Sequence, residues 1–161
     1  MAIKVGDALP ADVKLKEMQG GGPKDVSLAE LSKGKRVVLF AVPGAFTPTC
    51  SMKHLPGFVE DAEKIRAKGV DEIVCVSVND AFVMDAWGKA AGASGKVRML
   101  ADGNGDFTRA VGLELDASGF GMGKRSQRYG MVVKDGKVEQ LHVEPGPGLN
   151  VCSAESILAK L

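Results

Sequence analysis

One thiol stands where a strand-like run gives way to the start of a helix. Cys50 lies within "AVPGAFTPTCSMKHLPG", residues 41–57. Thr47 suits the N-cap position of a helix and Pro48 its first helical position, so Cys50 falls inside the first turn. There, unpaired backbone N–H groups and the helix dipole favour an anion, and cysteines in such places usually titrate below about 8.5. The spacing predicts a reactive thiolate at Cys50 rather than a small buried side chain.

Several other thiol chemistries fit this sequence poorly. No second cysteine follows Cys50 at the spacing of a C-x-x-C dithiol motif. A thiol peptidase needs a histidine base, and the chain has only His54 and His142. His54 lies one helical turn after Cys50 and could orient the thiol, but we expect a surface or loop histidine there. We expect His142 on a hairpin strand, facing solvent.

Metal and cofactor sites are also poorly supported. Cys50 and His54 could supply two zinc ligands, but no second closely spaced pair accompanies them. The glycine-rich run "GFGMGKR", residues 119–125, lacks the Ser or Thr that follows Lys in a phosphate-binding loop. We therefore expect no metal and no cofactor.

The elements that must position Cys50 alternate between strands and helices. Continuous apolar runs predict buried strands, and periodic stripes with capping residues predict helices. We expect Pro56 to kink or divide the helix that carries Cys50, and Asp135-Gly136 to form a hairpin turn. The predicted strands are 36–42, 72–78, 97–100, 128–133 and 138–143, and the predicted helices are 27–33, one after Cys50 ending at Gly69, 80–91, 105–113 and one capped by Ser153.

This order indicates an α/β fold with a central mixed β-sheet flanked by helices. Cys50 then lies at the carboxyl end of the central strand 36–42, where ligands bind in open α/β sheets. The pattern alone leaves thioredoxin-like and flavodoxin-like arrangements both open.

Composition narrows the class of protein. The chain has 161 residues, of which 45% are hydrophobic and 25% charged, with a net charge of +1. This size suits one domain, residues 1–161, and the weak charge argues against a nucleic-acid partner. No stretch approaches the roughly 20 apolar residues of a membrane span, and no signal-peptide pattern opens the chain. We expect a cytoplasmic protein, or an organellar one such as a chloroplast or mitochondrial protein if a transit peptide has been removed.

The segment "PGAFTPTCS", residues 43–51, resembles the P-x-x-x-T-x-x-C signature of peroxiredoxins, and its wording resembles the type II, or atypical, subfamily. The segments "KHLPGF", "LADGNGDFTRAVGLELD" and "RYGMVV" resemble that subfamily in order and spacing. The resemblance covers the chain from "VGDALP" to "SAESILAKL" and implies a thioredoxin-like fold.

The resemblance implies a role for each matching residue. Cys50 resembles the peroxidatic cysteine, and Thr47 the residue whose hydroxyl binds peroxide and thiolate. Pro43 resembles the proline that shields the site from water, and Arg128 the arginine that completes the pocket. The sequence pattern alone does not decide whether Arg128 or the nearby Arg125 has this role. We expect Arg125 to be a solvent-exposed charge in a loop.

The chemistry that the resemblance implies is a thiol peroxidase that reduces hydrogen peroxide and alkyl hydroperoxides. Oxidised Cys50 must be resolved by a second thiol. Cys75 lies mid-strand, where we expect a buried and inert thiol, and Cys152 lies in a loop where a mobile thiol is easier to place. Cys152 is the preferred resolving candidate, Cys75 is the other, and external glutathione or a glutaredoxin is a third route.

The expected partners are peroxides, a thioredoxin or glutaredoxin/glutathione reductant, and a second copy in a homodimer. The alternative function is a peroxide-sensing redox switch that acts through oxidation of Cys50.

Overall fold

A seven-stranded mixed sheet forms the centre of the computed structural model, which describes residues 2–146 and 148–161. Its strand order is β2-β1-β5-β4-β3-β8-β9. The central strands β3, β4 and β5 are parallel, and β1 and β8 run antiparallel to them. The strand bounds are β1 Leu15–Gln19, β2 Gly22–Val26, β3 Arg36–Val42, β4 Glu72–Ser77, β5 Arg98–Ala101, β8 Tyr129–Lys134 and β9 Lys137–Val143. The predicted mixed sheet is confirmed.

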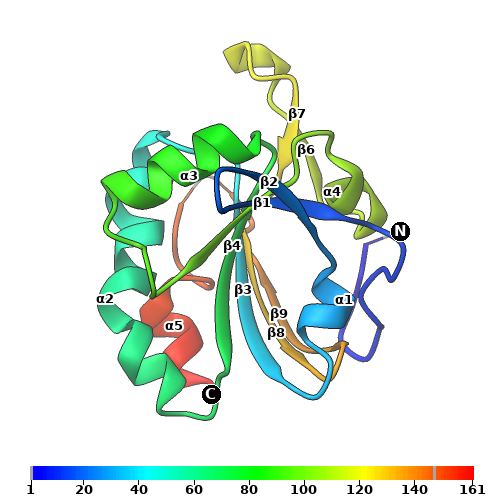
Figure 1. Cartoon of the computed structure of the whole chain (residues 1–161), viewed down its shortest axis with the longest axis vertical. Helices are drawn as coiled ribbons and strands as arrows, with labels where there is room; N and C mark the ends of the chain where they lie inside the picture. The colour runs from blue at the N-terminus through cyan, green and yellow to red at the C-terminus, as the bar shows by residue number, and fades with distance from the viewer. Residues whose placement is uncertain (1, 147) are drawn as a thin grey trace.

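Helices cover both faces of this sheet (Figure 1). The helices α2 (Leu55–Arg66), α3 (Ala81–Ala90) and α5 (Ala154–Ala159) pack on one face, and α1 (Leu28–Leu31) and α4 (Asp106–Ala110) on the other. Because β3 is buried on both faces, its sequence is continuously apolar instead of alternating. None of the described helices is long and apolar enough to cross a membrane.

One turn and two helix caps that the sequence predicts are present in the structure. Asp135 and Gly136 have φ of 49° and 76° and connect β8 to β9 as a hairpin, as the Asp-Gly pair predicts. The Ser153 hydroxyl accepts from Ser156 N at 3.1 Å and caps α5. Ser27 caps α1 in the same way.

Two hairpins were not predicted. The glycine turn at Gly20 and Gly21 joins β1 to β2, and a second hairpin pairs β6 (Glu114–Asp116) with β7 (Lys124–Ser126). Both contain polar, exposed residues at sheet edges, so they lack the apolar run that marks a buried strand. The second hairpin and its short helix η2 (Ser118–Phe120) project beyond the rest of the molecule (Figure 1).

The helix that carries Cys50 begins at Pro48, as predicted, but it is not divided at Pro56. A π-helical turn, η1 (Cys50–His54), leads directly into α2, and Leu55 N donates to Cys50 O. Proline has no N–H, and the wide turn just before Pro56 is where the helix departs from regular α geometry. The helix therefore continues through Pro56, and its irregularity surrounds Cys50.

Candidate active site

Cys50 and Arg128 meet although 78 residues separate them. The strands β3 and β8 are neighbours, so the helix start that follows β3 lies beside Arg128, which immediately precedes β8. Arg128 Nη2 donates to Cys50 Sγ at 3.0 Å. The family resemblance selected Arg128 for this site, and the structure places its guanidinium within hydrogen-bond distance of the Cys50 sulfur.

The Cys50 sulfur is fully buried. The sequence predicted a reactive thiolate at Cys50 rather than a small buried side chain. Cys50 instead belongs to the apolar cluster that includes Phe40 and Leu55, since the first turn of its helix packs onto the sheet. The sulfur is therefore held between the start of its helix and the sheet, with Arg128 against it.

Thr47 does not use its side chain as a helix cap. Its hydroxyl donates to Gly44 O at 2.6 Å, while Thr47 O accepts from Ser51 N. The preceding residue, Phe46, has φ of 62°, which is unusual for a bulky residue and marks a tight turn. The Thr47 hydroxyl points its proton at Gly44 O, so the Thr47 oxygen keeps lone pairs that can accept a hydrogen bond.

Pro43 and Arg125 lie against one another at the start of this loop. Arg125 Nη1 approaches Pro43 O at 3.5 Å, and its Nε donates to Met122 O at 2.9 Å. A Cβ on Gly44 would lie 3.1 Å from Arg125 Nη1, so the glycine permits this close approach. The expectation of a solvated loop charge at Arg125 was wrong: the half-buried side chain braces the loop that carries Thr47.

His54 is buried and connects Arg128 to a distant segment. Its Nδ1 lies 2.9 Å from Arg128 Nη1 and its Nε2 lies 3.0 Å from Cys152 O. Because arginine can only donate, Nδ1 accepts and Nε2–H donates, which defines a neutral imidazole. Burial, with the Arg128 charge, lowers the pKa of His54 to about 3. The expected surface histidine was wrong, since His54 packs against Phe40 instead.

The two remaining cysteines are both buried, and all three thiols are free. Cys75 lies mid-strand on β4 opposite Phe40, as predicted. Burial raises the pKa of the Cys75 thiol well above its usual range, and the nearby Cys50 adds to the effect. Cys75 therefore has the properties of an inert core thiol.

Cys152 lies just before α5, as predicted, and its side chain is buried rather than open to solvent. Glu144 Oε2 accepts from the backbone N–H groups of Asn150, Val151 and Cys152 at 2.8, 2.7 and 2.9 Å. Burial raises the pKa of the Cys152 thiol, and the adjacent Glu144 carboxylate raises it further. Glu144 was not predicted as a site residue, because nothing in "HVEPGPGLNVCS" shows that the chain folds back onto it.

His142 lies on β9, as predicted, and is half-buried rather than open to solvent. Its Nε2 lies 3.0 Å from Gln140 Oε1, so it belongs to the surface of the hairpin and not to the Cys50 site.

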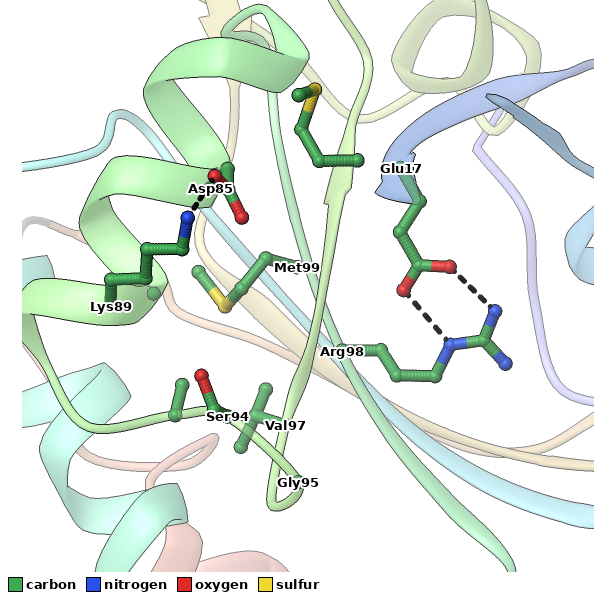
Figure 2. Close-up of a pocket in the computed structure, with 11 residues that line it drawn as sticks. Glu17, Asp85, Lys89, Ser94, Gly95, Val97, Arg98 and Met99 are labelled. Carbon is green, nitrogen blue, oxygen red and sulfur yellow. Dashed lines mark hydrogen bonds and ion pairs between the residues drawn. The ribbon is translucent and has the colours of Figure 1, made fainter. Parts of the chain in front are cut away.

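A pocket of about 180 Å³ lies elsewhere, between β1, α3 and β5 (Figure 2). Its charged groups are paired with one another: Arg98 with Glu17 and Lys89 with Asp85. None of the predicted site residues lines this pocket. This pocket is therefore separate from the Cys50 site.

Comparisons with known proteins agree with this geometry. The Redoxin family matches residues 4–158. Peroxiredoxin-2B of Arabidopsis thaliana is 48% identical over 159 residues, covering 99% of this chain and 98% of the relative. Chloroplastic Peroxiredoxin-2E-2 of Oryza sativa subsp. japonica is 52% identical over 163 residues, covering 99% and 72%.

A solved structure resembles the whole chain equally well. Reduced Prx3 from Vibrio vulnificus in complex with H₂O₂ superposes with a TM-score of 0.94 at 52% identity and covers 98% of both chains. Identity of this size over the full chain exceeds what a shared fold alone requires. The chain belongs to the peroxiredoxins, thiol peroxidases with a thioredoxin-like fold.

Proposed function

We propose that Cys50 is the peroxidatic residue and that it reduces hydrogen peroxide and alkyl hydroperoxides. The thiolate attacks one peroxide oxygen, an S–O bond forms, the O–O bond breaks, and the other oxygen leaves as water or an alcohol after taking up a proton. Cys50 becomes a sulfenic acid. The observation that carries this proposal is the 3.0 Å hydrogen bond from Arg128 Nη2 to the Cys50 sulfur, because a fixed cation beside the thiol stabilises its anion.

Arg128, Thr47 and Pro43 have distinct proposed roles. The guanidinium of Arg128 has further N–H groups that can stabilise charge on the leaving oxygen. The Thr47 oxygen accepts a hydrogen bond from the peroxide O–H and orients the molecule in line with the sulfur. Pro43 limits access of water to the loop, and the Arg125 contact with its carbonyl keeps it there.

The test is Cys50→Ser, which keeps nearly the same side-chain size. We expect loss of H₂O₂ consumption with an unchanged thermal unfolding midpoint, measured with the reduced protein and one equivalent of peroxide. Full activity in this variant would contradict the assignment.

We further propose that Cys152 resolves Cys50. The Cys152 sulfur attacks the sulfenic sulfur, a disulfide forms and water leaves, and thioredoxin or glutaredoxin/glutathione then reduces the disulfide. This requires residues 150–152 to leave Glu144. The test is mass mapping of the oxidised protein. We expect a Cys50–Cys152 disulfide. A Cys50–Cys75 disulfide or a glutathione adduct would contradict resolution by Cys152.

One observation favours a second candidate function, a peroxide-sensing switch. The Glu144 contacts hold Cys152 in place, so a sulfenic acid on Cys50 could persist long enough to react with a partner protein. A steady-state assay with thioredoxin and its reductase separates the two functions. Continuous turnover supports the peroxidase, and stoichiometric oxidation without turnover supports the sensor.

We also propose a homodimer that forms at the carboxyl ends of the parallel strands. Phe46 follows β3 and Phe82 lies in the first turn of α3, after β4, and these residues are 53% and 64% exposed. Phe120 on η2, in the projecting hairpin at the same end, is 86% exposed (Figure 1). Sedimentation equilibrium should show a dimer that Phe120→Glu weakens, and a wild-type monomer contradicts the proposal.

The cellular location that we propose is the cytoplasm, with an organelle as the alternative. Relatives named as chloroplastic are among the similar proteins. Expression of the native full-length gene product with a fluorescent tag distinguishes the two.

A further inference from the structure

A series of hydrogen bonds connects the Cys50 sulfur to the Glu144 carboxylate through Arg128, His54 and Cys152. Arg128 donates to Cys50 Sγ with one terminal nitrogen and to His54 Nδ1 with the other. His54 Nε2–H donates to Cys152 O. We call residues 150–152 the Cys152 segment.

Glu144 holds the Cys152 segment in this arrangement. One carboxylate oxygen accepts all three backbone N–H groups of the segment, at 2.7 to 2.9 Å. The other oxygen, Oε1, is buried without a hydrogen-bond partner among the described residues. Glu144 N also donates to Arg128 O at 2.9 Å, so the same residue ties the backbone of Arg128 to the segment.

We propose that Glu144 and His54 are positioning residues that make the reaction of Cys50 with peroxide depend on the docked Cys152 segment. This inference rests on the proposed role of Cys50. The segment then supports the reaction of Cys50 before any disulfide forms. It does so through the Cys152 backbone carbonyl, which accepts from His54, and not through the Cys152 thiol.

The physical reason lies in what His54 must present to Arg128. Nδ1 can accept from the guanidinium only while the imidazole is neutral with its proton on Nε2, and that proton needs an acceptor because the ring is fully buried. Cys152 O is that acceptor. When the segment leaves, the Nε2–H loses its partner, the ring is free to turn, and Arg128 loses the contact that holds its planar fork against the sulfur.

The coupling has a consequence for the catalytic cycle. Departure of the Cys152 segment to form a disulfide also dismantles the Arg128 arrangement. Cys50 recovers full reactivity only after the disulfide is reduced and the segment has docked again on Glu144 and His54.

The experiment measures the second-order rate at which the reduced protein consumes H₂O₂. Trp87, the single tryptophan, is the fluorescence reporter, because its Nε1 lies 3.4 Å from the hydroxyl of Ser51, next to Cys50. We expect Glu144→Ala to slow this rate about tenfold and His54→Phe at least as much, since each removes a buried positioning contact. The double variant should be no slower than His54→Phe alone, because Glu144 acts through His54.

A rescue variant distinguishes positioning from general destabilisation. His54→Asn keeps an acceptor near the place of Nδ1 but cannot reach Cys152 O. We expect it to recover most of the rate lost in His54→Phe and to be insensitive to Glu144→Ala. The matched control is His142→Gln, which changes the half-buried histidine on β9 and should keep the wild-type rate.

Three results would overturn the inference. The first is a wild-type rate of H₂O₂ consumption in folded Glu144→Ala. The second is a loss of rate in the double variant equal to the product of the two single losses. The third is an equal rate in His54→Asn and His54→Phe. If Glu144→Ala does not fold, the two His54 variants decide alone. Failure of the proposed function looks different, because Cys50→Ser would then consume peroxide as fast as the wild type.

Discussion

Arg128 divides its two terminal nitrogens between Cys50 Sγ and His54 Nδ1, which makes the geometry of its planar fork important as well as its charge. Replacement of Arg128 by Gln removes the charge and one of the two contacts. We expect the rate of peroxide consumption to fall about 10²–10³-fold. Arg109→Gln is the matched control, because Arg109 is half exposed and pairs with Asp106 on α4. A loss below about threefold in Arg128→Gln would show that the guanidinium does not stabilise the reaction.

The Thr47 hydroxyl offers a second test at the same scale. It donates to Gly44 O at 2.6 Å, so its oxygen faces the site as an acceptor. Thr47→Val keeps the shape and removes the hydroxyl, and we expect the peroxide rate to fall about 10²-fold or more. Thr47→Ser keeps the hydroxyl and should retain a rate within about tenfold of the wild type. Equal rates in the two variants would show that Thr47 only fills space.

The residues of the site differ in how far the sequence could predict them. Pro43, Thr47 and Cys50 lie within nine positions of one another, so a local signature carries them. Arg128 was assigned by family resemblance and not by pattern. The roles of His54, Arg125 and Glu144 depend on contacts between segments that are 74 to 98 residues apart or on a loop that folds back on itself, and neither is encoded in local spacing.

At the scale of elements, the buried strands were predictable and the edge hairpins were not. Burial on both faces gives β3 and β4 continuous apolar runs, and β3 has the predicted bounds, 36–42. The strands β1 and β2 are half solvent-exposed, and "GPKDV" contains a proline and two charges. Pairing at a sheet edge, rather than side-chain pattern, forms these strands.

Gly130 on β8 allows α5 and the Cys152 segment to pack closely against the strand beside the site. A Cβ at Gly130 would lie 3.0 Å from both Cys152 Cβ and Ile157 Cδ1, so only glycine lets α5 and the Cys152 segment pack this closely. We expect Gly130→Ala to destabilise the protein by about 1–3 kcal/mol in chemical unfolding and to slow the reaction of Cys50. Gly22→Ala is the matched control, because a Cβ there meets no atom within 4 Å. Equal stability of the two variants contradicts this account of the packing.

At the scale of the whole molecule, both the stability of the fold and the arrangement of the site depend on the protonation state of His54. The neutral state of His54 that Arg128 requires is also the state that the folded protein enforces, since burial and the Arg128 charge lower its pKa to about 3. In the unfolded chain the pKa of a histidine is about 6.5. Below that pH the unfolded state binds a proton that the folded state does not, so acid favours unfolding.

This linkage sets the direction and size of a final prediction. The stabilisation from neutral His54 is complete above about pH 7 and is lost progressively as the pH falls from about 6.5 towards 3, by up to about 1.4 kcal/mol per pH unit. We expect the free energy of unfolding, measured by urea denaturation, to fall by about 2 kcal/mol between pH 7 and pH 5. Burial lowers the pKa of His142 as well, so His142→Gln removes a smaller part of this dependence. His54→Phe should remove most of it, since carboxyl groups titrate mainly below this window. An unchanged pH dependence in His54→Phe would show that His54 binds its proton equally well in the folded and unfolded chains, which contradicts the lowered pKa of His54.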